Sequence, residues 1–140
     1  MLLNILTWGL AVGVLHFAVV GGLYQNPLVA KLYHAAEEHP GVKPWPDKKK
    51  YVLSMFLGTQ LEVFILTAGY LWLRQLQLGA TSAERVFALG GIFAALRVYP
   101  RFWNMWIQST YPGPLLAVEL VNGTLGTFLI VAGVEWLAAR

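Results

Sequence analysis

Two arginines, Arg97 and Arg101, lie four residues apart within an otherwise apolar stretch from about Val86 to Ile107. A stretch of this length is typical of a membrane span. A charged side chain near the bilayer centre costs roughly 2.5–3.5 kcal/mol on insertion scales, so it needs a partner in protein or water. Guanidinium groups bind carboxylates and phosphates through paired hydrogen bonds. We therefore expect these two arginines to clamp an anionic group.

The same helical face carries further polar residues, and three other apolar stretches each supply a polar stripe at helical spacing. At about 1.5 Å per residue, Glu62 and Arg97 come out near the bilayer centre, and the other polar groups lie roughly 5–11 Å to one side of it. The predicted ligand- or proton-binding cluster comprises His16, Glu62, Arg97, Arg101, Asn104, Glu119 and Asn122.

Several roles fit this cluster. The two arginines and two glutamates balance in charge, so the glutamates could serve as counter-charges or bind protons. His16 could relay a proton near neutral pH, or could simply bond a backbone carbonyl or Glu119. The cluster could also only hold helices together, although such bonds contribute roughly 0.6 kcal/mol each and rarely repay the insertion cost of four charges.

Composition narrows the class of protein. Of 140 residues, 57% are hydrophobic and 12% are charged, whereas soluble domains carry about 25% charged residues. The absence of cysteine excludes disulfides and thiolate metal sites. The net charge of +3 comes without a basic patch interleaved with aromatics, which argues against nucleic-acid binding. His34 and Glu38 have metal-ligand spacing but lack a third ligand, so we predict no metal site and no cofactor.

The predicted fold is all-α, an integral membrane up-down four-helix bundle forming one domain over residues 1–140. We expect Asn26 and Pro27 to start a short interfacial amphipathic helix after the first span. Pro100 predicts a kink or break in the third span. Glu135, beside Trp136, is expected to be interfacial. The predicted spans are 2–23, 51–73, 84–107 and 115–137, with an interfacial helix and loop over 27–50.

Charge in the loops predicts an orientation. Five lysines lie between the first and second spans, which places that loop in the cytoplasm and both termini outside. The spacing of Gly9 and Gly13 allows close helix approach, either within the bundle or between two copies of the chain.

The segment Gly22-Leu-Tyr-Gln-Asn-Pro-Leu-Val-Ala-Lys-Leu-Tyr33 resembles the end of the first helix in a family of small bacterial four-helix membrane proteins of unknown function. Asn122-Gly and Trp136 in the last span are similar as well. The His-x-x-Glu-Glu string at 34–38 resembles the signature of another uncharacterised small membrane family. The resemblance implies four spans in a bacterial inner membrane and no particular activity.

Together these features predict a multi-pass membrane protein that binds or transports a small anionic or amphiphilic ligand, or protons, at the cluster. Its expected partners are membrane lipid, the ligand, and further copies of itself or a larger membrane complex. One alternative is an accessory or scaffold subunit whose polar stripes only pack helices. Another is an intramembrane enzyme with Glu62 or Glu119 as general acid–base, a reading that the small size of the chain disfavours.

Overall fold

The computed structural model describes residues 1–140 and is all-α, with no strand. Its elements in chain order are α1 (Leu2–Tyr24), α2 (Pro27–Ala35), α3 (Lys48–Leu73), the 3-10 turn η1 (Arg74–Leu76), α4 (Ser82–Arg97), α5 (Tyr99–Gln108) and α6 (Gly113–Ala138).

Three stretches are long and apolar enough to cross a membrane: Leu2–Tyr24, Lys48–Leu76 and Gly113–Ala138. The stretch predicted as the third span is divided into α4 and α5, of 16 and 10 residues. Neither is long enough alone, so a fourth crossing requires both together.

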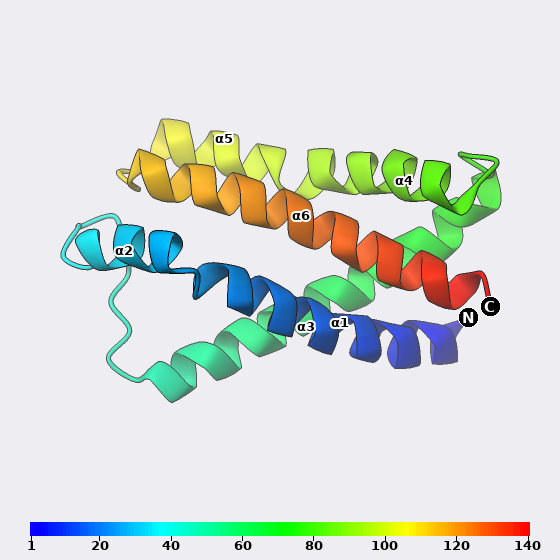
Figure 1. The fold of residues 1–140 in the computed structure, drawn as a ribbon, viewed down its shortest axis with the longest axis horizontal. Helices are drawn as coiled ribbons and strands as arrows, with labels where there is room; N and C mark the ends of the chain where they lie inside the picture. The colour runs from blue at the N-terminus through cyan, green and yellow to red at the C-terminus, as the bar shows by residue number, and fades with distance from the viewer.

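The division between α4 and α5 follows from Pro100, which confirms the predicted break. Proline has no backbone N–H and its ring crowds the preceding turn. Val98 alone separates the two helices, and its backbone still donates to Ala94 O (2.9 Å) and accepts from Phe102 N–H (2.9 Å). The two helices therefore follow one another end to end, with a changed direction between them (Figure 1).

Helix starts follow the expected capping chemistry. Asn26 caps α2 by accepting from Leu28 N–H at 2.9 Å, and Pro27 occupies the first turn, as predicted. Thr81 and Glu84 form a capping box at the start of α4. Asp47 accepts from the N–H groups of two lysines and starts α3 at Lys48, so the residues 48–50 predicted to lie in the loop are helical.

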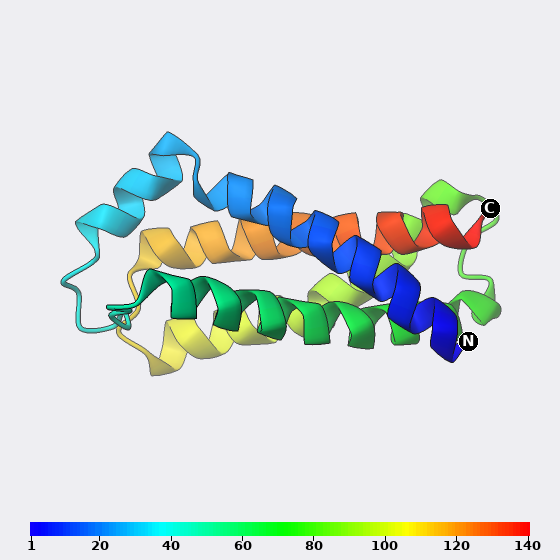
Figure 2. The same cartoon turned by 90° about the horizontal axis from the view of Figure 1, so that it is seen from below.

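Helix α6 is the central element and contacts α1, α2, α3, α4 and α5 (Figures 1 and 2). Helix α1 crosses α3 at two glycines: a Cβ at Gly9 would come within 2.5 Å of the Phe64 ring, and one at Gly13 would overlap the Gln60 side chain. The glycine pair is thus used within the chain. Both termini lie at one end of the molecule, and α2 lies at the other.

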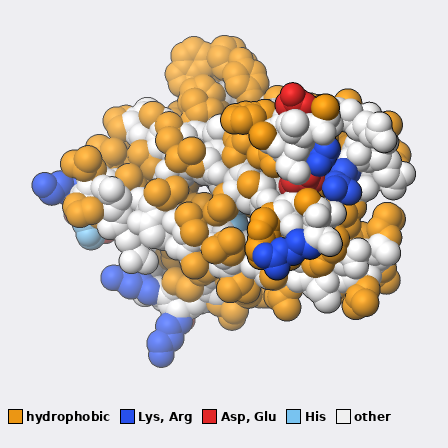
Figure 3. All heavy atoms as spheres, turned by 45° about the vertical axis from the view of Figure 1, so that its right-hand side comes forward, with side chains coloured by type: hydrophobic (Ala, Val, Ile, Leu, Met, Phe, Trp, Pro, Cys, Tyr) orange, Lys and Arg blue, Asp and Glu red, His pale blue; other side chains and the backbone are white.

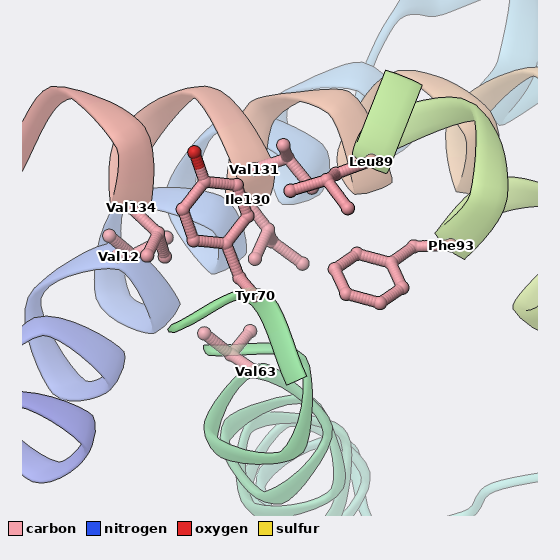
Figure 4. Close-up of a cluster of buried hydrophobic side chains, with 8 residues drawn as sticks. All are labelled: Val12, Val63, Tyr70, Leu89, Phe93, Ile130, Val131 and Val134. Atoms are coloured by element: carbon pink, nitrogen blue, oxygen red, sulfur yellow. The ribbon is translucent and has the colours of Figure 1, made fainter. Parts of the chain in front are cut away.

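The apolar core lies in the half of the molecule nearer the termini. Its side chains come from α1, α3, α4 and α6 and interlock around the ring of Tyr70, whose hydroxyl points out of the cluster (Figure 4). The members are Val12, Val63, Tyr70, Leu89, Phe93, Ile130, Val131 and Val134. The predicted polar residues begin where this cluster ends.

Candidate functional site

The centre of the candidate site is an ion pair between Arg97 of α4 and Glu62 of α3. Arg97 Nη2 donates to Glu62 Oε2 at 2.7 Å, and Arg97 Nε donates to Glu62 Oε1. The remaining nitrogen, Nη1, donates to Thr127 Oγ1 at 2.7 Å and to Gly123 O at 3.3 Å on α6. One guanidinium therefore links three helices, and every nitrogen of it is used.

This pair is open to one side of the molecule. The side chain of Glu62 is 39% exposed and that of Arg97 is 20% exposed. They lie in a shallow cavity of about 360 Å³ between α3 and α4, whose other walls are Gly58, Leu61, Ile65 and Leu66. The cavity exists because α3 packs chiefly on α1 and α4 chiefly on α6, leaving few contacts between α3 and α4.

His16 and Asn122 lie on the buried side of the site, where α1 meets α6. A Cβ at Gly126 would come within 2.6 Å of His16 Nε2, so the missing side chain is what admits the imidazole. His16 Nδ1 and Asn122 Nδ2 are buried without a hydrogen-bond partner in the chain. Neither expected partner of His16, a backbone carbonyl or Glu119, is bonded to it.

Two further buried polar atoms, Gln60 Oε1 and Thr67 Oγ1, also lack partners. Buried polar groups are hydrogen-bonded in the great majority of structures. Gln60 is anchored by its other end, since Nε2 donates to Gly9 O at 2.9 Å. The inner faces of α1, α3 and α6 therefore offer hydrogen-bonding sites that the chain itself does not use.

Glu119 and Arg101 form a separate group nearer α2. Tyr33 OH donates to Glu119 Oε1 at 2.7 Å, whereas Arg101 Nη2 is 3.7 Å from Glu119 Oε2. Arg101 is 68% exposed, so this contact is a loose ion pair. Burial and then the charge of Glu119 raise the pKa of the Tyr33 phenol, which keeps it a proton donor. Sequence reasoning missed Tyr33 because it lies on α2, outside the predicted spans.

Asn104 lies elsewhere. It is exposed on α5 and makes no side-chain hydrogen bond. The stripe that joined it to Arg97 assumed one unbroken helix, and the interruption at Val98 ends that register. Of the seven predicted site residues, the structure joins Glu62 with Arg97, pairs Arg101 with Glu119, buries His16 on α1 and Asn122 on α6 without a bond between them, and leaves Asn104 alone.

The most extensive polar network surrounds a residue outside the predicted cluster, Glu135. This carboxylate is 3% exposed. Its Oε1 accepts from Arg85 Nη2 (2.6 Å) and Nε (3.1 Å), and its Oε2 accepts from Arg74 Nε (3.0 Å) and from the hydroxyl of Tyr70. Glu135 is therefore a buried structural anchor near the end of α6, a role that the expectation of an interfacial residue beside Trp136 did not include.

A signal for this network exists in the sequence. In an up-down arrangement, the end of the second span, the start of the third and the end of the fourth share one side of the membrane. Arg74, Arg85 and Glu135 occupy these three positions.

Along α6, Glu119 and Glu135 are 16 residues apart, or about 24 Å, with the Glu62–Arg97 pair between them. The charged groups thus lie at three levels of the molecule.

Comparison of the chain with models of known protein families, with curated proteins and with solved structures finds no match. The short resemblances at residues 22–33 and 34–38 therefore lend no support to any proposal below, and function has to be inferred from the geometry of the chain itself.

Proposed function

We propose that this chain is an integral membrane four-helix bundle that binds a small amphiphilic molecule at the Glu62–Arg97 pair. Three stretches have the length and apolarity to cross, and α4 with α5 would supply the fourth crossing beside α6. An even number of crossings agrees with the two termini lying at one end (Figure 1). The lysine-rich end, near α2, would face the cytoplasm.

The observation that carries the binding proposal is the sideways opening of the ion pair. Leu61 and Ile65 are exposed on α3 and would face lipid, yet Glu62 between them is also exposed by more than a third. A carboxylate and a guanidinium at this depth need polar partners, because hydrocarbon offers none. A ligand whose polar group reached the pair from the lipid side would provide them.

The geometry also indicates the kind of polar group. Arg97 has no free nitrogen, so an anionic ligand would have to displace Glu62 from it. Each Glu62 oxygen retains acceptor capacity after bonding Arg97. We therefore favour an amphiphile whose head group donates hydrogen bonds, such as a hydroxyl or an ammonium, with its apolar part along Leu61, Ile65 and Leu66. Transport of this ligand or of protons stays a prediction.

Substitutions at two other glycines, Gly58 and Gly91, test this proposal without changing the ion pair. Gly58 lines the cavity, and neither Gly58 nor Gly91 of α4 has any atom within 4 Å of an added Cβ. Both substitutions to leucine should fold, since they replace an open helical glycine. We expect Gly58→Leu to fill the cavity and abolish ligand retention, measured by native mass spectrometry after gentle extraction, and Gly91→Leu to leave retention unchanged. Equal retention in wild type and Gly58→Leu would refute the proposal.

A second candidate is an accessory subunit of a larger membrane complex. It is favoured by the outer face of α5, where Trp103 stacks on Tyr99 (centroids 6.1 Å) and contacts Trp106 (5.1 Å), all three being exposed. The same mass spectrum separates the two functions. Stoichiometric recovery with a larger assembly, without a small ligand, would favour the subunit. Catalysis by Glu62 has less support, because Arg97 bonds both its oxygens.

A further inference from the structure

A second hollow lies at the end of the molecule that carries the termini, away from the Glu62–Arg97 pair. It has a volume of about 850 Å³ and is formed by the end of α3, η1, the loop before α4 and the first turn of α4. This is within the range of small-molecule sites. We name it the Arg74 cleft; its polar walls are Arg74, Arg85, Gln75, Gln77 and the backbone of Gly79 and Ala80.

The Arg74 cleft is rich in unused hydrogen-bond donors. Arg74 is 34% exposed and donates to Glu135 through Nε alone, so its two terminal nitrogens make no hydrogen bond in the chain. The side-chain amides of Gln75 and Gln77 are unbonded as well. Arg85, by contrast, is fully engaged with Glu135, Ser82 and backbone carbonyls.

The walls of the Arg74 cleft carry two guanidinium groups and no carboxylate. Two glutamates lie beside these walls: Glu135 bonds both arginines, and Glu84 accepts from the N–H groups of Ala80 (2.7 Å) and Thr81 (3.1 Å). The formal charges therefore balance, and it is the free donors of the lining that favour an anion. Figure 3 looks onto this end of the molecule, where basic side chains gather beside acidic ones.

Two further features belong to this end of the molecule. Gln77 has a left-handed backbone (φ 49°, ψ 45°), the only positive φ of a non-glycine residue in the chain. It caps η1 and turns the chain toward α4, which leaves Gln75 and Gln77 bordering the cleft. Trp72 and Trp136 are exposed at the same end, as in the aromatic belts that mark the membrane–water interface.

We propose that the Arg74 cleft binds a phosphate group, carried by a phospholipid head group or by a phosphorylated solute, through the terminal nitrogens of Arg74 and the amides of Gln75 and Gln77. Arginine suits this role because its planar donors match phosphate oxygens in pairs. Arg85 adds its charge but stays bound to Glu135, which holds the wall of the cleft in place. This site does not depend on ligand binding at Glu62–Arg97, and each can fail without the other.

The test uses the full chain in a detergent solution that contains no phosphate. One arm titrates inorganic phosphate at constant ionic strength by calorimetry. The other measures retention of phosphatidylglycerol against a diacylglycerol with the same chains by native mass spectrometry. Binding in the first arm indicates a solute, and phospholipid-selective retention in the second indicates a lipid. We expect Arg74→Gln to weaken the observed binding about tenfold or more, equivalent to about 1.4 kcal/mol.

Two variants make the result specific. Arg140→Gln removes the same charge at the same end, but Arg140 lies over the Trp136 ring and outside the cleft, so binding should persist. Ala80→Trp fills the cleft without removing a charged group and should abolish binding even if Arg74→Gln folds poorly. The proposal is overturned if neither probe binds, if Arg140→Gln weakens binding as much as Arg74→Gln, or if Ala80→Trp binds normally.

Discussion

Replacement of Glu135 by glutamine should destabilise this protein more than replacement of any glutamate in the predicted cluster. The carboxylate is buried and accepts hydrogen bonds from three side chains: Tyr70 of α3, Arg74 of η1 and Arg85 of α4. Glutamine has nearly the same shape but offers one acceptor oxygen and no charge. The substitution therefore leaves donors facing an amide N–H₂ group within an otherwise packed site.

The magnitude follows from burial. Removing one partner of a buried ion pair costs about 3–5 kcal/mol. Arg74 is a third exposed, so water would recover part of its loss. We expect about 3 kcal/mol for Glu135→Gln, measured as the free energy of unfolding in a titration with sodium dodecyl sulfate followed by tryptophan fluorescence. Tyr70→Phe removes one charge-assisted bond and should cost about 1.5–3 kcal/mol.

The matched control is Glu119→Gln. Glu119 is less buried, and its cationic partner Arg101 is mostly exposed at 3.7 Å, so this contact resembles a surface ion pair worth about 0–1 kcal/mol. The double variant Tyr70→Phe/Glu135→Gln should cost less than the sum of its parts, because both single changes weaken or remove the same hydrogen bond between Tyr70 and residue 135. A cost near the roughly 0.6 kcal/mol of an average membrane hydrogen bond, or equal losses at Glu119 and Glu135, would refute the reasoning.

Two further predictions use the same unfolding titration. Gly126→Ala should destabilise the protein by about 1–3 kcal/mol, because the added Cβ would overlap His16 and crowd Val20 in a packed contact. Gly91→Ala, whose added Cβ meets no atom, should stabilise it by up to about 1 kcal/mol through helix propensity. A change of the same sign for both variants would contradict the α1–α6 contact. Asn104→Ala should change neither stability, beyond about 0.5 kcal/mol, nor ligand retention, because the side chain is exposed and unbonded; loss of retention would return Asn104 to the site.

Pairing of Glu62 with Arg97 illustrates what could be predicted. Both residues lie mid-way along apolar stretches, and an unpaired charge there is too costly to persist. Depth and charge balance therefore indicate that they share one level of the molecule. Neither property indicates that Arg97 would also bond Thr127 and Gly123 on α6, or that the pair would open sideways. Those features depend on how closely α3 and α4 approach, and that distance is set by the packing of each on other helices.

Asn104 shows the opposite case. Its inclusion in the cluster rested on a helical register extended through Pro100, and a break at Val98 invalidates any register beyond it. The sequence predicted the break correctly, but the direction of α5 after the break depends on its contacts with α6. Tyr33 was missed for a related reason, since only the fold brings α2 back over the start of α6.

By itself the sequence determined the all-α character of this protein, its three long apolar helices, the helix caps at Asn26 and Thr81, and the break near Pro100. These depend on local composition and backbone chemistry, which act over a few residues. Only the tertiary structure decided which charges meet. Glu135 lies beside Trp136 at a helix end, and the sequence predicts only an interfacial position for it. Its role as the most heavily bonded carboxylate appears once Tyr70, Arg74 and Arg85 converge on it. The physical reason is that an ion pair between helices depends on their separation and rotation, which no local pattern encodes.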